Sequence, residues 1–105
     1  MIANTPKPPY YVVIFTSLRT PGDNDYAEMS KRMMEMVSEQ EGYLGCESAR
    51  EELGITVSYW KDLDSIQKWK FNSEHSVAKA MGKEKWYRSF KTRIAKVERD
   101  YDFEK

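Results

Sequence analysis

The segment Tyr10–Arg19 constrains the fold of this chain more than any other. Its sequence, YYVVIFTSLR, is rich in β-branched and aromatic residues and is bounded by Pro9 and by Pro21-Gly22, which predicts a β-strand. Alternate residues of a strand point to opposite faces, and here both faces are apolar. A strand of this kind has to be covered on both sides. We therefore expect helices against one face of its sheet and a further layer against the other.

A helix is expected after this strand. Asp25 and Glu28 have the spacing of a capping box, apolar residues recur at helical spacing after them, and Gly42 is suited to end the helix. Two short strands should follow over Tyr43–Arg50 and Ile55–Lys61. The residues between them form a hairpin loop whose last residue, a glycine, is available for a positive φ.

A second helical region and a last strand complete the pattern. Asp62 can cap a helix that runs to about Phe71. Asn72-Ser73 is expected to interrupt this helix, and Ser73 can cap a second one. The last strand is predicted over Ser89–Tyr101, where a change of phase in the apolar residues predicts a β-bulge near Ala95.

The predicted order β-α-β-β-α-β is typical of an α+β, ferredoxin-like domain with an antiparallel sheet and both helices on one face. We assign residues 10–105 to this domain and residues 1–9, which are rich in proline, to a flexible N-terminal arm. Since the first strand is apolar on both faces, the face without helices should pack against the same face of a second copy. The pattern therefore predicts a homodimer formed through sheet faces.

Composition excludes several classes of protein. The 105 residues include 17 basic and 17 acidic ones, so the net charge is zero, and no nucleic-acid-binding motif is present. No run approaches the roughly 18 apolar residues of a membrane-spanning helix. The lone cysteine, Cys46, cannot form an internal disulfide, and the N-terminus has no apolar signal core, which predicts a cytoplasmic protein. One histidine and one cysteine give no metal-ligand set.

A set of short motifs extends over Tyr10–Tyr101: FTS at 15–17, GYLG at 42–45 followed by ES at 47–48, ITVSYW at 55–60, Ile66 with WK at 69–70, EH at 74–75, WY at 86–87 and IAKVER at 94–99. Together these motifs resemble the antibiotic biosynthesis monooxygenase (ABM) superfamily. The resemblance implies a dimeric α/β barrel with a pocket between sheet and helices in each subunit. Some members oxidise polycyclic phenols with O₂ and no metal or cofactor, others bind and degrade haem, and many have no assigned reaction.

The haem-degrading branch uses an Asn on the first strand and a Trp and a His in the second helical region. Trp69 matches the tryptophan of that branch. The first strand contains no Asn, and the matching His position is about Lys79, whereas His75 lies four residues earlier. We therefore expect no cofactor, with haem as the minority alternative.

Oxidation of a small planar aromatic or quinol with O₂ is the first functional hypothesis. It requires aromatic walls, a proton acceptor and donors for a developing oxyanion. We expect His75 and Trp69 to be catalytic, with His75 as the base. If Ser73 begins a helix, His75 lies in its first turn, where the helix dipole favours the neutral imidazole. The other expected pocket residues, of which Tyr87 or Arg93 would stabilise the oxyanion, are Phe15, Ser17, Tyr59, Trp86, Tyr87 and Arg93.

Two alternatives stay open. One is a haem-binding or haem-degrading protein. The other is a non-catalytic small-molecule-binding or stress-associated dimeric barrel, because a single His on an amphipathic segment is commonly structural and Trp60 most simply ends a strand in the core or in an interface. A closed aromatic cavity with His75 at its wall would favour catalysis, whereas a filled core would favour binding or a structural role.

Overall fold

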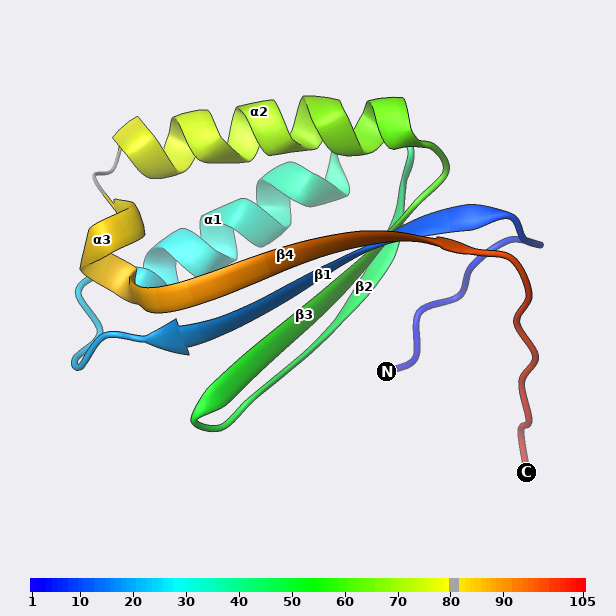
Figure 1. Cartoon of the computed structure of the whole chain (residues 1–105), viewed down its shortest axis with the longest axis horizontal. Helices are drawn as coiled ribbons and strands as arrows, with labels where there is room; N and C mark the ends of the chain where they lie inside the picture. The colour runs from blue at the N-terminus through cyan, green and yellow to red at the C-terminus, as the bar shows by residue number, and fades with distance from the viewer. Residues whose placement is uncertain (80–81) are drawn as a thin grey trace.

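A four-stranded antiparallel sheet carries three helices on one of its faces in the computed structural model, which describes residues 1–79 and 82–105 (Figure 1). The strands lie in the order β2-β3-β1-β4. In chain order the elements are β1 (Tyr10–Arg19), α1 (Tyr26–Ser38), β2 (Tyr43–Arg50), β3 (Leu53–Trp60), α2 (Leu63–Lys79), α3 (Gly82–Trp86) and β4 (Tyr87–Val97). The predicted ferredoxin-like α+β fold is confirmed, and the short helix α3 precedes the last strand, where the sequence also predicts a turn of helix over Lys83–Tyr87.

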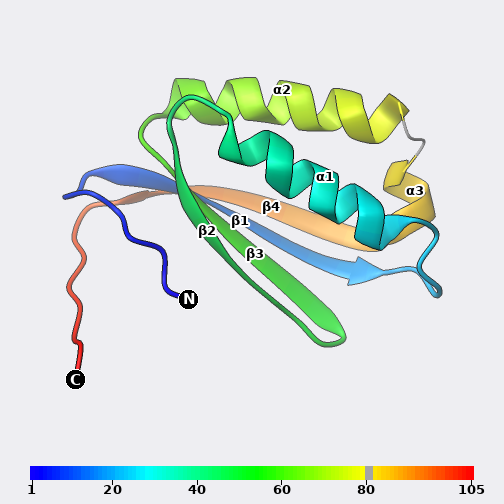
Figure 2. The ribbon, with the colours of Figure 1, turned by 180° about the vertical axis from the view of Figure 1, so that it is seen from behind.

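Strand β1 has the predicted bounds and lies inside the sheet, antiparallel to β3 and β4. Because side chains alternate along a strand, its apolar residues divide between the two faces. Tyr11 and Val13 pack against the helix-side core, so Val12 and Ile14 lie on the opposite face. The helices cover only one of the two apolar faces, as both views of the ribbon show (Figures 1 and 2).

The main hydrophobic core lies between one end of the sheet and the two long helices. Trp60 is completely buried there, with 0% of its surface exposed, and packs with Val37 of α1 and Ile66 of α2. Its indole N–H donates to Ser58 Oγ at 2.9 Å, so the buried donor has a partner. The prediction that Trp60 ends a strand inside the core is confirmed. The partly buried residues packed around this cluster are Tyr11, Val13, Tyr43 and Trp69.

The ends of α1 differ from the predicted ones. Asp25 has a left-handed backbone conformation, with φ 68° and ψ 16°, and its side chain makes no capping hydrogen bond with the described residues. The carboxylate of Asp23 accepts a hydrogen bond from the backbone N–H of Ala27 at 3.2 Å instead. The helix ends at Ser38, well before Gly42. That glycine is required for a different reason, because a Cβ atom there would overlap a side chain at the start of α2.

Helix α2 is continuous, which corrects the predicted interruption at Asn72-Ser73. Its start is as predicted, because Asp62 Oδ1 accepts a hydrogen bond from the backbone N–H of Ser65 at 2.7 Å. The hydroxyl of Ser73 donates to the carbonyl of Lys70 at 3.1 Å, a bond that lets serine stay within a helix. His75 therefore lies inside a helix and not in a first turn, so the argument for a neutral imidazole from the helix dipole does not apply.

Two details of the strands also correct the predictions. Gly54 belongs to β3 and not to the turn, and it is not among the residues with a positive φ. The irregular step in the pairing of β1 with β4 lies between Leu18 and Arg19, and the register is regular through Ala95. The apolar residues of β4 change phase because they belong to two different faces, so no bulge is needed near Ala95.

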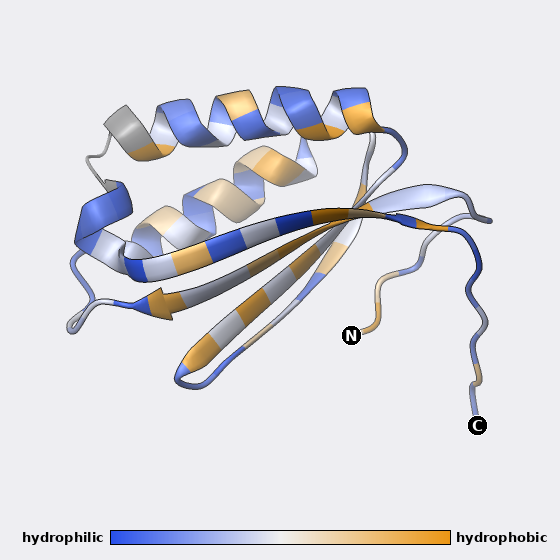
Figure 3. Cartoon of the chain, viewed as in Figure 1, coloured by the Kyte–Doolittle hydropathy of each residue, from blue (hydrophilic) through white to orange (hydrophobic). Residues whose placement is uncertain are grey.

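The sheet face opposite the helices is apolar and partly open. Leu53 and Ile55 of β3 are 48% and 40% exposed on this face, which also contains Val12 and Ile14 of β1. Figure 3 shows hydrophobic residues recurring along β1 and β3, whereas β4 carries more hydrophilic ones. None of the helices in the described part of the chain is both long and apolar enough to cross a membrane.

Both chain ends are attached to one end of this opposite face. The backbone N–H of Ala3 donates to Glu47 at 2.9 Å, and the Tyr59 hydroxyl donates to the same carboxylate at 2.6 Å. The Tyr10 hydroxyl donates to Asp100 at 2.5 Å, just beyond the end of β4. These contacts connect the N-terminal arm and the C-terminal segment to the sheet.

Candidate functional site

The helix-facing side of the sheet has two ends that carry different kinds of side chain. The strand register shows which residues lie in the same row across the four strands. The rows nearest the β2–β3 turn, which we call the open end, are Ser48–Thr56–Phe15–Thr92 and Arg50–Gly54–Ser17–Phe90, each written from β2 to β4. The rows at the other end, which we call the packed end, are Tyr43–Trp60–Tyr11–Lys96 and Cys46–Ser58–Val13–Ile94.

Hydroxyl groups line the open end. Ser17, Ser48, Thr56 and Thr92 come one from each of the four strands, and the hydroxyls of Ser48 and Thr56 lie 3.1 Å apart. Ser48 and Thr92 are exposed and Thr56 is half-buried. The β2–β3 hairpin projects away from the helices in both views of the ribbon (Figures 1 and 2). This part of the sheet therefore presents polar groups that the helix layer does not bury.

Three aromatic rings in mutual contact form one side of the open end. The ring of Phe15 lies 5.5 Å from that of Tyr87 and 5.3 Å from that of Phe90, and the last two are 5.7 Å apart. Phe90 is 41% exposed, so part of this aromatic surface faces solvent. Two further rings connect the group to the helices, since Tyr26 lies 5.8 Å from Tyr87 and 6.2 Å from Trp86. We call Phe15, Tyr87 and Phe90 the aromatic triad.

Tyr87 is a phenol that stays protonated. Burial raises its pKa well above the usual value, and a hydrogen bond with Tyr26 raises it further. The positive charges of Arg50 and Arg19 act in the opposite direction but do not outweigh burial. Around neutral pH the Tyr87 hydroxyl therefore keeps its proton, and its hydrogen bond with Tyr26 is one in which Tyr87 donates.

Arg19 has a structural role beside this group. Its guanidinium carbon lies 3.5 Å from the centre of the Tyr26 ring. Its Nε donates to the carbonyl of Trp86 at 2.9 Å, and Nη2 donates to the carbonyls of Gly22 at 3.4 Å and Asp23 at 3.2 Å. Arg19 thus connects the end of β1 to α3 and to the turn before α1.

The two residues predicted to be catalytic lie outside the open end. His75 is exposed on α2. Trp69 is half-buried in the packed core, where its ring lies 6.4 Å from that of Trp60 at an interplanar angle of 26°. Neither of the two surface cavities described below includes His75, and the core at Trp69 is filled, so the criterion of a closed aromatic cavity with His75 at its wall is not met there. The catalytic roles of both residues stay predictions.

The six predicted pocket residues divide into two groups. Phe15, Ser17 and Tyr87 come together at the open end, and buried Trp86 supports them by way of Tyr26. The other two predicted pocket residues, Tyr59 and Arg93, lie on the opposite face of the sheet, paired with Val12 and Ile14.

Tyr59 has a different environment from the one predicted. Its hydrogen bond to Glu47 is the largest cause that raises its pKa, to about 12, and the same bond is the main cause that lowers the pKa of Glu47. This pair belongs to the attachment of the N-terminal arm and not to the open end.

Sequence reasoning missed Arg50, Phe90 and the threonines of the open end. Strand alternation from Ser17 would have placed Phe15 on the same face, but the partners on β2, β3 and β4 depend on register. Register follows from the turn, and the predicted loop over 51–54 was two residues too long, so the pairing of Arg50 with Gly54 was not predicted.

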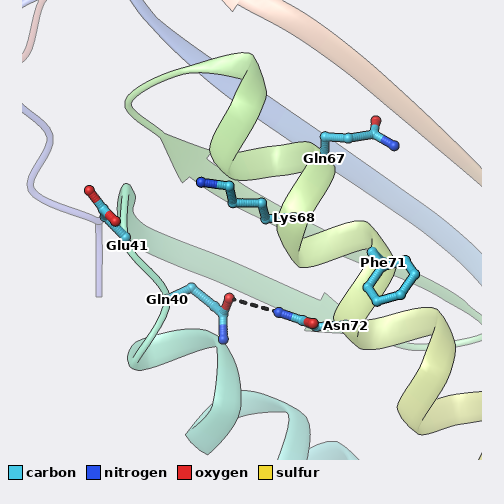
Figure 4. A pocket seen from close by; sticks show the side chains of 6 residues that line it. All are labelled: Gln40, Glu41, Gln67, Lys68, Phe71 and Asn72. Atoms are coloured by element: carbon cyan, nitrogen blue, oxygen red, sulfur yellow. Dashed lines mark hydrogen bonds between the residues drawn. The ribbon is translucent and has the colours of Figure 1, made fainter.

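Two surface cavities lie elsewhere. The larger, of about 390 Å³, lies between the end of α1 and the outer side of α2, and Figure 4 shows the side chains that line it. Asn72 Nδ2 donates to Gln40 Oε1 at 3.2 Å across it, and Phe71 at its edge is 71% exposed. The smaller, of about 210 Å³, lies between α1 and α3 beside the Lys85–Asp25 ion pair at 3.4 Å. Neither contains a residue of the open end.

Within residues 1–79 and 82–105 no three His, Cys, Asp or Glu side chains are grouped so that they would hold a metal ion. The free thiol of Cys46 is half-buried at the packed end.

Known structures share this fold over most of the chain. PA3566 from Pseudomonas aeruginosa superposes with a TM-score of 0.66 at 18% identity, over 91% of this chain and 99% of that one. SnoaB from Streptomyces nogalater, a cofactor-independent oxygenase, superposes with a TM-score of 0.67 at 10% identity, over 93% and 100%. A Bordetella bronchiseptica protein provisionally assigned as an antibiotic biosynthesis monooxygenase gives 0.65 at 13% identity, over 84% and 96%. The chain therefore has the fold of the ABM superfamily, as its motifs predicted.

A sequence relative defines the narrower family. The uncharacterized protein YqjZ of Bacillus subtilis (strain 168) is 45% identical to this chain. The alignment has 105 positions and covers 98% of this chain and 92% of YqjZ. The chain belongs to the family of YqjZ. No family model matches the chain.

Proposed function

We propose that this protein is a cofactor-independent monooxygenase that oxidises a small planar aromatic or quinol with O₂ at the open end of its sheet. The observation that carries the proposal is the aromatic triad beside a surface of hydroxyl groups on the helix-facing side. A planar, oxygen-bearing ring system has the shape and the polar groups to match both features. SnoaB, which shares the fold, is a cofactor-independent oxygenase.

The reaction needs no electron donor besides the substrate. For an anthrone, both C–H bonds of one methylene break and a C=O bond forms at that carbon. One oxygen atom of O₂ enters the product, and the other leaves as water with the two hydrogens. All the electrons that O₂ takes up come from the methylene carbon, so the product is a quinone and the protein is unchanged.

The residues of the open end have separate roles in this proposal. Phe15 and Phe90 provide faces for the planar substrate. When substrate binds, the Tyr87 hydroxyl turns from Tyr26 and donates its hydrogen bond to the substrate oxygen on which negative charge develops. The hydroxyls of Ser48, Thr56 and Thr92 accept or donate hydrogen bonds at the edge of the ring system.

An oxygen electrode tests the proposal directly. O₂ uptake is measured with 1,8-dihydroxyanthrone and with a panel of hydroquinones, and uptake without protein is subtracted. We expect Tyr87→Phe to lower kcat by about tenfold or more, because one donor to the developing charge is lost. We expect Phe90→Ala to raise KM, whereas Phe71→Ala, at the cavity on the outer side of α2, provides the matched control.

The pH dependence of the O₂-uptake rate gives a second test of the role of Tyr87. Because the pKa of Tyr87 is raised, its proton stays bound as the pH increases through the ordinary tyrosine range near 10. The ratio of wild-type to Tyr87→Phe rates should therefore stay constant up to that pH. No uptake above the protein-free rate on any substrate would contradict the proposal and leave the non-catalytic binding protein as the better description.

We also propose that the protein is a homodimer through the sheet face opposite the helices, in a reducing, cytoplasmic setting. Leu53 and Ile55 provide exposed apolar area there, and half-buried Ile14 extends it onto β1. Pairing the same face of two copies is self-complementary, which suits a two-fold dimer. The open end lies on the other side of the sheet, so dimerisation in this way leaves it accessible.

A further inference from the structure

We propose that Arg50 anchors an anionic oxygen of the ligand, a carboxylate or an ionised phenol carried on a planar aromatic body. This inference rests on the proposed function only for the location of the site, and it names the substrate class. The first observation is the space that the sequence leaves for the Arg50 side chain.

Gly54 leaves space for the Arg50 guanidinium. It is paired with Arg50 across β2 and β3, and it has no positive φ, so its backbone does not require glycine. A Cβ atom at this position would overlap the Arg50 guanidinium at Cζ, Nη2 and Nε. The absence of a side chain at Gly54 therefore lets the guanidinium lie across β3 toward β1.

One hydrogen bond holds the guanidinium of Arg50 on the side that faces β1. Arg50 Nη2 donates to the hydroxyl of Ser17, a side chain that is only 2% exposed. Arginine carries a fork of several N–H donors, and the remaining ones match the paired oxygens of a carboxylate. Among the described residues no carboxylate lies within 4.0 Å of Arg50, and the residue is exposed overall.

The position of Arg50 relative to the aromatic triad suits one ligand that contacts both. Ser17, which accepts the hydrogen bond from Arg50, is paired with Phe90 and follows Phe15 on the same face of β1. The positive charge of Arg50 also reaches Tyr87, since it acts to lower the pKa of that phenol. A planar ring lying on the triad would therefore direct a substituent at its edge toward the guanidinium.

Arg19, in the same region, makes a different set of contacts from Arg50, and these contacts are structural. Its guanidinium donates to three backbone carbonyls and stacks on Tyr26. Arg50 donates to one side-chain hydroxyl and lies over a glycine. This contrast assigns ligand recognition to Arg50 and local structure to Arg19.

Binding of redox-inert probes tests the inference separately from turnover. The dissociation constants of anthraquinone-2-carboxylate and of neutral 2-(hydroxymethyl)anthraquinone are measured by calorimetry, and 2-hydroxyanthraquinone is titrated below and above its phenol pKa. We expect the wild-type protein to prefer at least one anionic probe by about tenfold or more, as for a charge-assisted pair. The preference should shrink at high salt, because Arg50 is exposed.

Two variants remove the anchor in different ways. Arg50→Gln deletes the charge, whereas Gly54→Ala keeps the charge but displaces the guanidinium. Both should reduce the preference for the anion to less than about twofold while affinity for the neutral probe changes little. Arg99→Gln, which removes an exposed arginine beyond the far end of β4, is the matched control and should keep the preference. Unchanged thermal unfolding of the variants shows that the fold is intact.

The outcomes separate this inference from the proposed function. Equal affinity of the wild-type protein for anionic and neutral probes, or an anion preference that survives in Arg50→Gln, would overturn the role of Arg50 and leave the aromatic site in place. No binding of any probe would overturn both. An anion preference that depends on Arg50, together with no O₂ uptake, would support the anchor and reject the monooxygenase.

Discussion

The packed end and the open end lie on the same side of one sheet and share the same four strands, yet their side chains differ in kind. At the packed end Trp60 is surrounded by side chains from both long helices, and its one polar atom is satisfied inside the core. At the open end hydroxyls, one arginine and partly exposed rings occupy the equivalent positions. The largest fully buried side chain, Trp60, lies at one end, and the hydroxyls and partly exposed rings lie at the other.

The contrast is already encoded in β1. The helix-facing residues of this strand change from Tyr11 and Val13 to Phe15 and Ser17 along its length. Ser17 is almost fully buried, but what covers it includes the side chain of Arg50. A single strand therefore contributes core at its start and a polar, aromatic surface at its end.

The largest expected effect separates the two ends by stability. Trp60→Ala should lower the free energy of unfolding by about 3–5 kcal/mol, because a large cavity is left in a closely packed core. Phe90→Ala should cost less than about 1.5 kcal/mol, since Phe90 is 41% exposed. Urea unfolding followed by circular dichroism measures both, and Trp60→Phe serves if the alanine variant does not fold. Equal losses at the two positions would remove the distinction between the ends.

The next effect concerns the homodimer. We propose that it forms through the opposite face of the sheet, so neither the packed end nor the open end belongs to the interface. Ile55→Glu places a charge on the opposite face and should convert the dimer to monomers of 12.4 kDa, as measured by light scattering after size exclusion. Ser48→Glu introduces the same charge at the open end and should leave the mass of the dimer unchanged. Dissociation by Ser48→Glu alone would mean that the open end is the interface.

A smaller effect depends on pH and lies at the attachment of the N-terminal arm. The folded-state pKa of Glu47 is lowered, chiefly by the Tyr59 hydroxyl and then by the backbone N–H of Ala3. A lowered carboxylate pKa contributes stability that is present above the unfolded value of about 4.5 and is lost as the pH falls through the folded value. Glu47→Gln should therefore be less stable than wild type at pH 7, and the difference should vanish in acid. A difference that persists at pH 2 would contradict this linkage.

The smallest effect is an expected absence of change. Haemin titration followed in the Soret region should give no shift that saturates at one haem per subunit, and His75→Ala should behave like wild type. The physical reason is that His75 is exposed on α2 and Trp69 is held against Trp60, so neither belongs to the aromatic triad. A saturating shift that is lost in His75→Ala would revive the haem alternative.

Local patterns predicted much of the fold. The apolar alternation of β1 and the Asp62 cap appear in the structure as expected, because each depends on neighbouring residues. The predicted break at Ser73 was wrong, since a serine can bond back to the carbonyl of Lys70 and stay helical. The cap at Asp25 was wrong because the chain turns through a left-handed conformation there, which the spacing of residues does not reveal.

The site was less predictable because it depends on which residues meet across strands. Phe15, Ser17 and Tyr87 were identified from the sequence, and the register brings them together with Phe90 and Arg50. Tyr59 and Arg93 were assigned to the same pocket although strand alternation places them on the opposite face. The face of a residue follows from local alternation only when the register is known.

Mapping a bound ligand by NMR tests the central claim most directly. Amide ¹H–¹⁵N shifts of the wild-type protein are followed during a titration with anthraquinone-2-carboxylate. The account predicts that the largest shifts cluster at Phe15, Ser17, Gly54, Tyr87 and Phe90, with little change around Trp60. Shifts confined to Gln40, Phe71 and Asn72, at the cavity outside the helices, or shifts centred on the packed end, would contradict it.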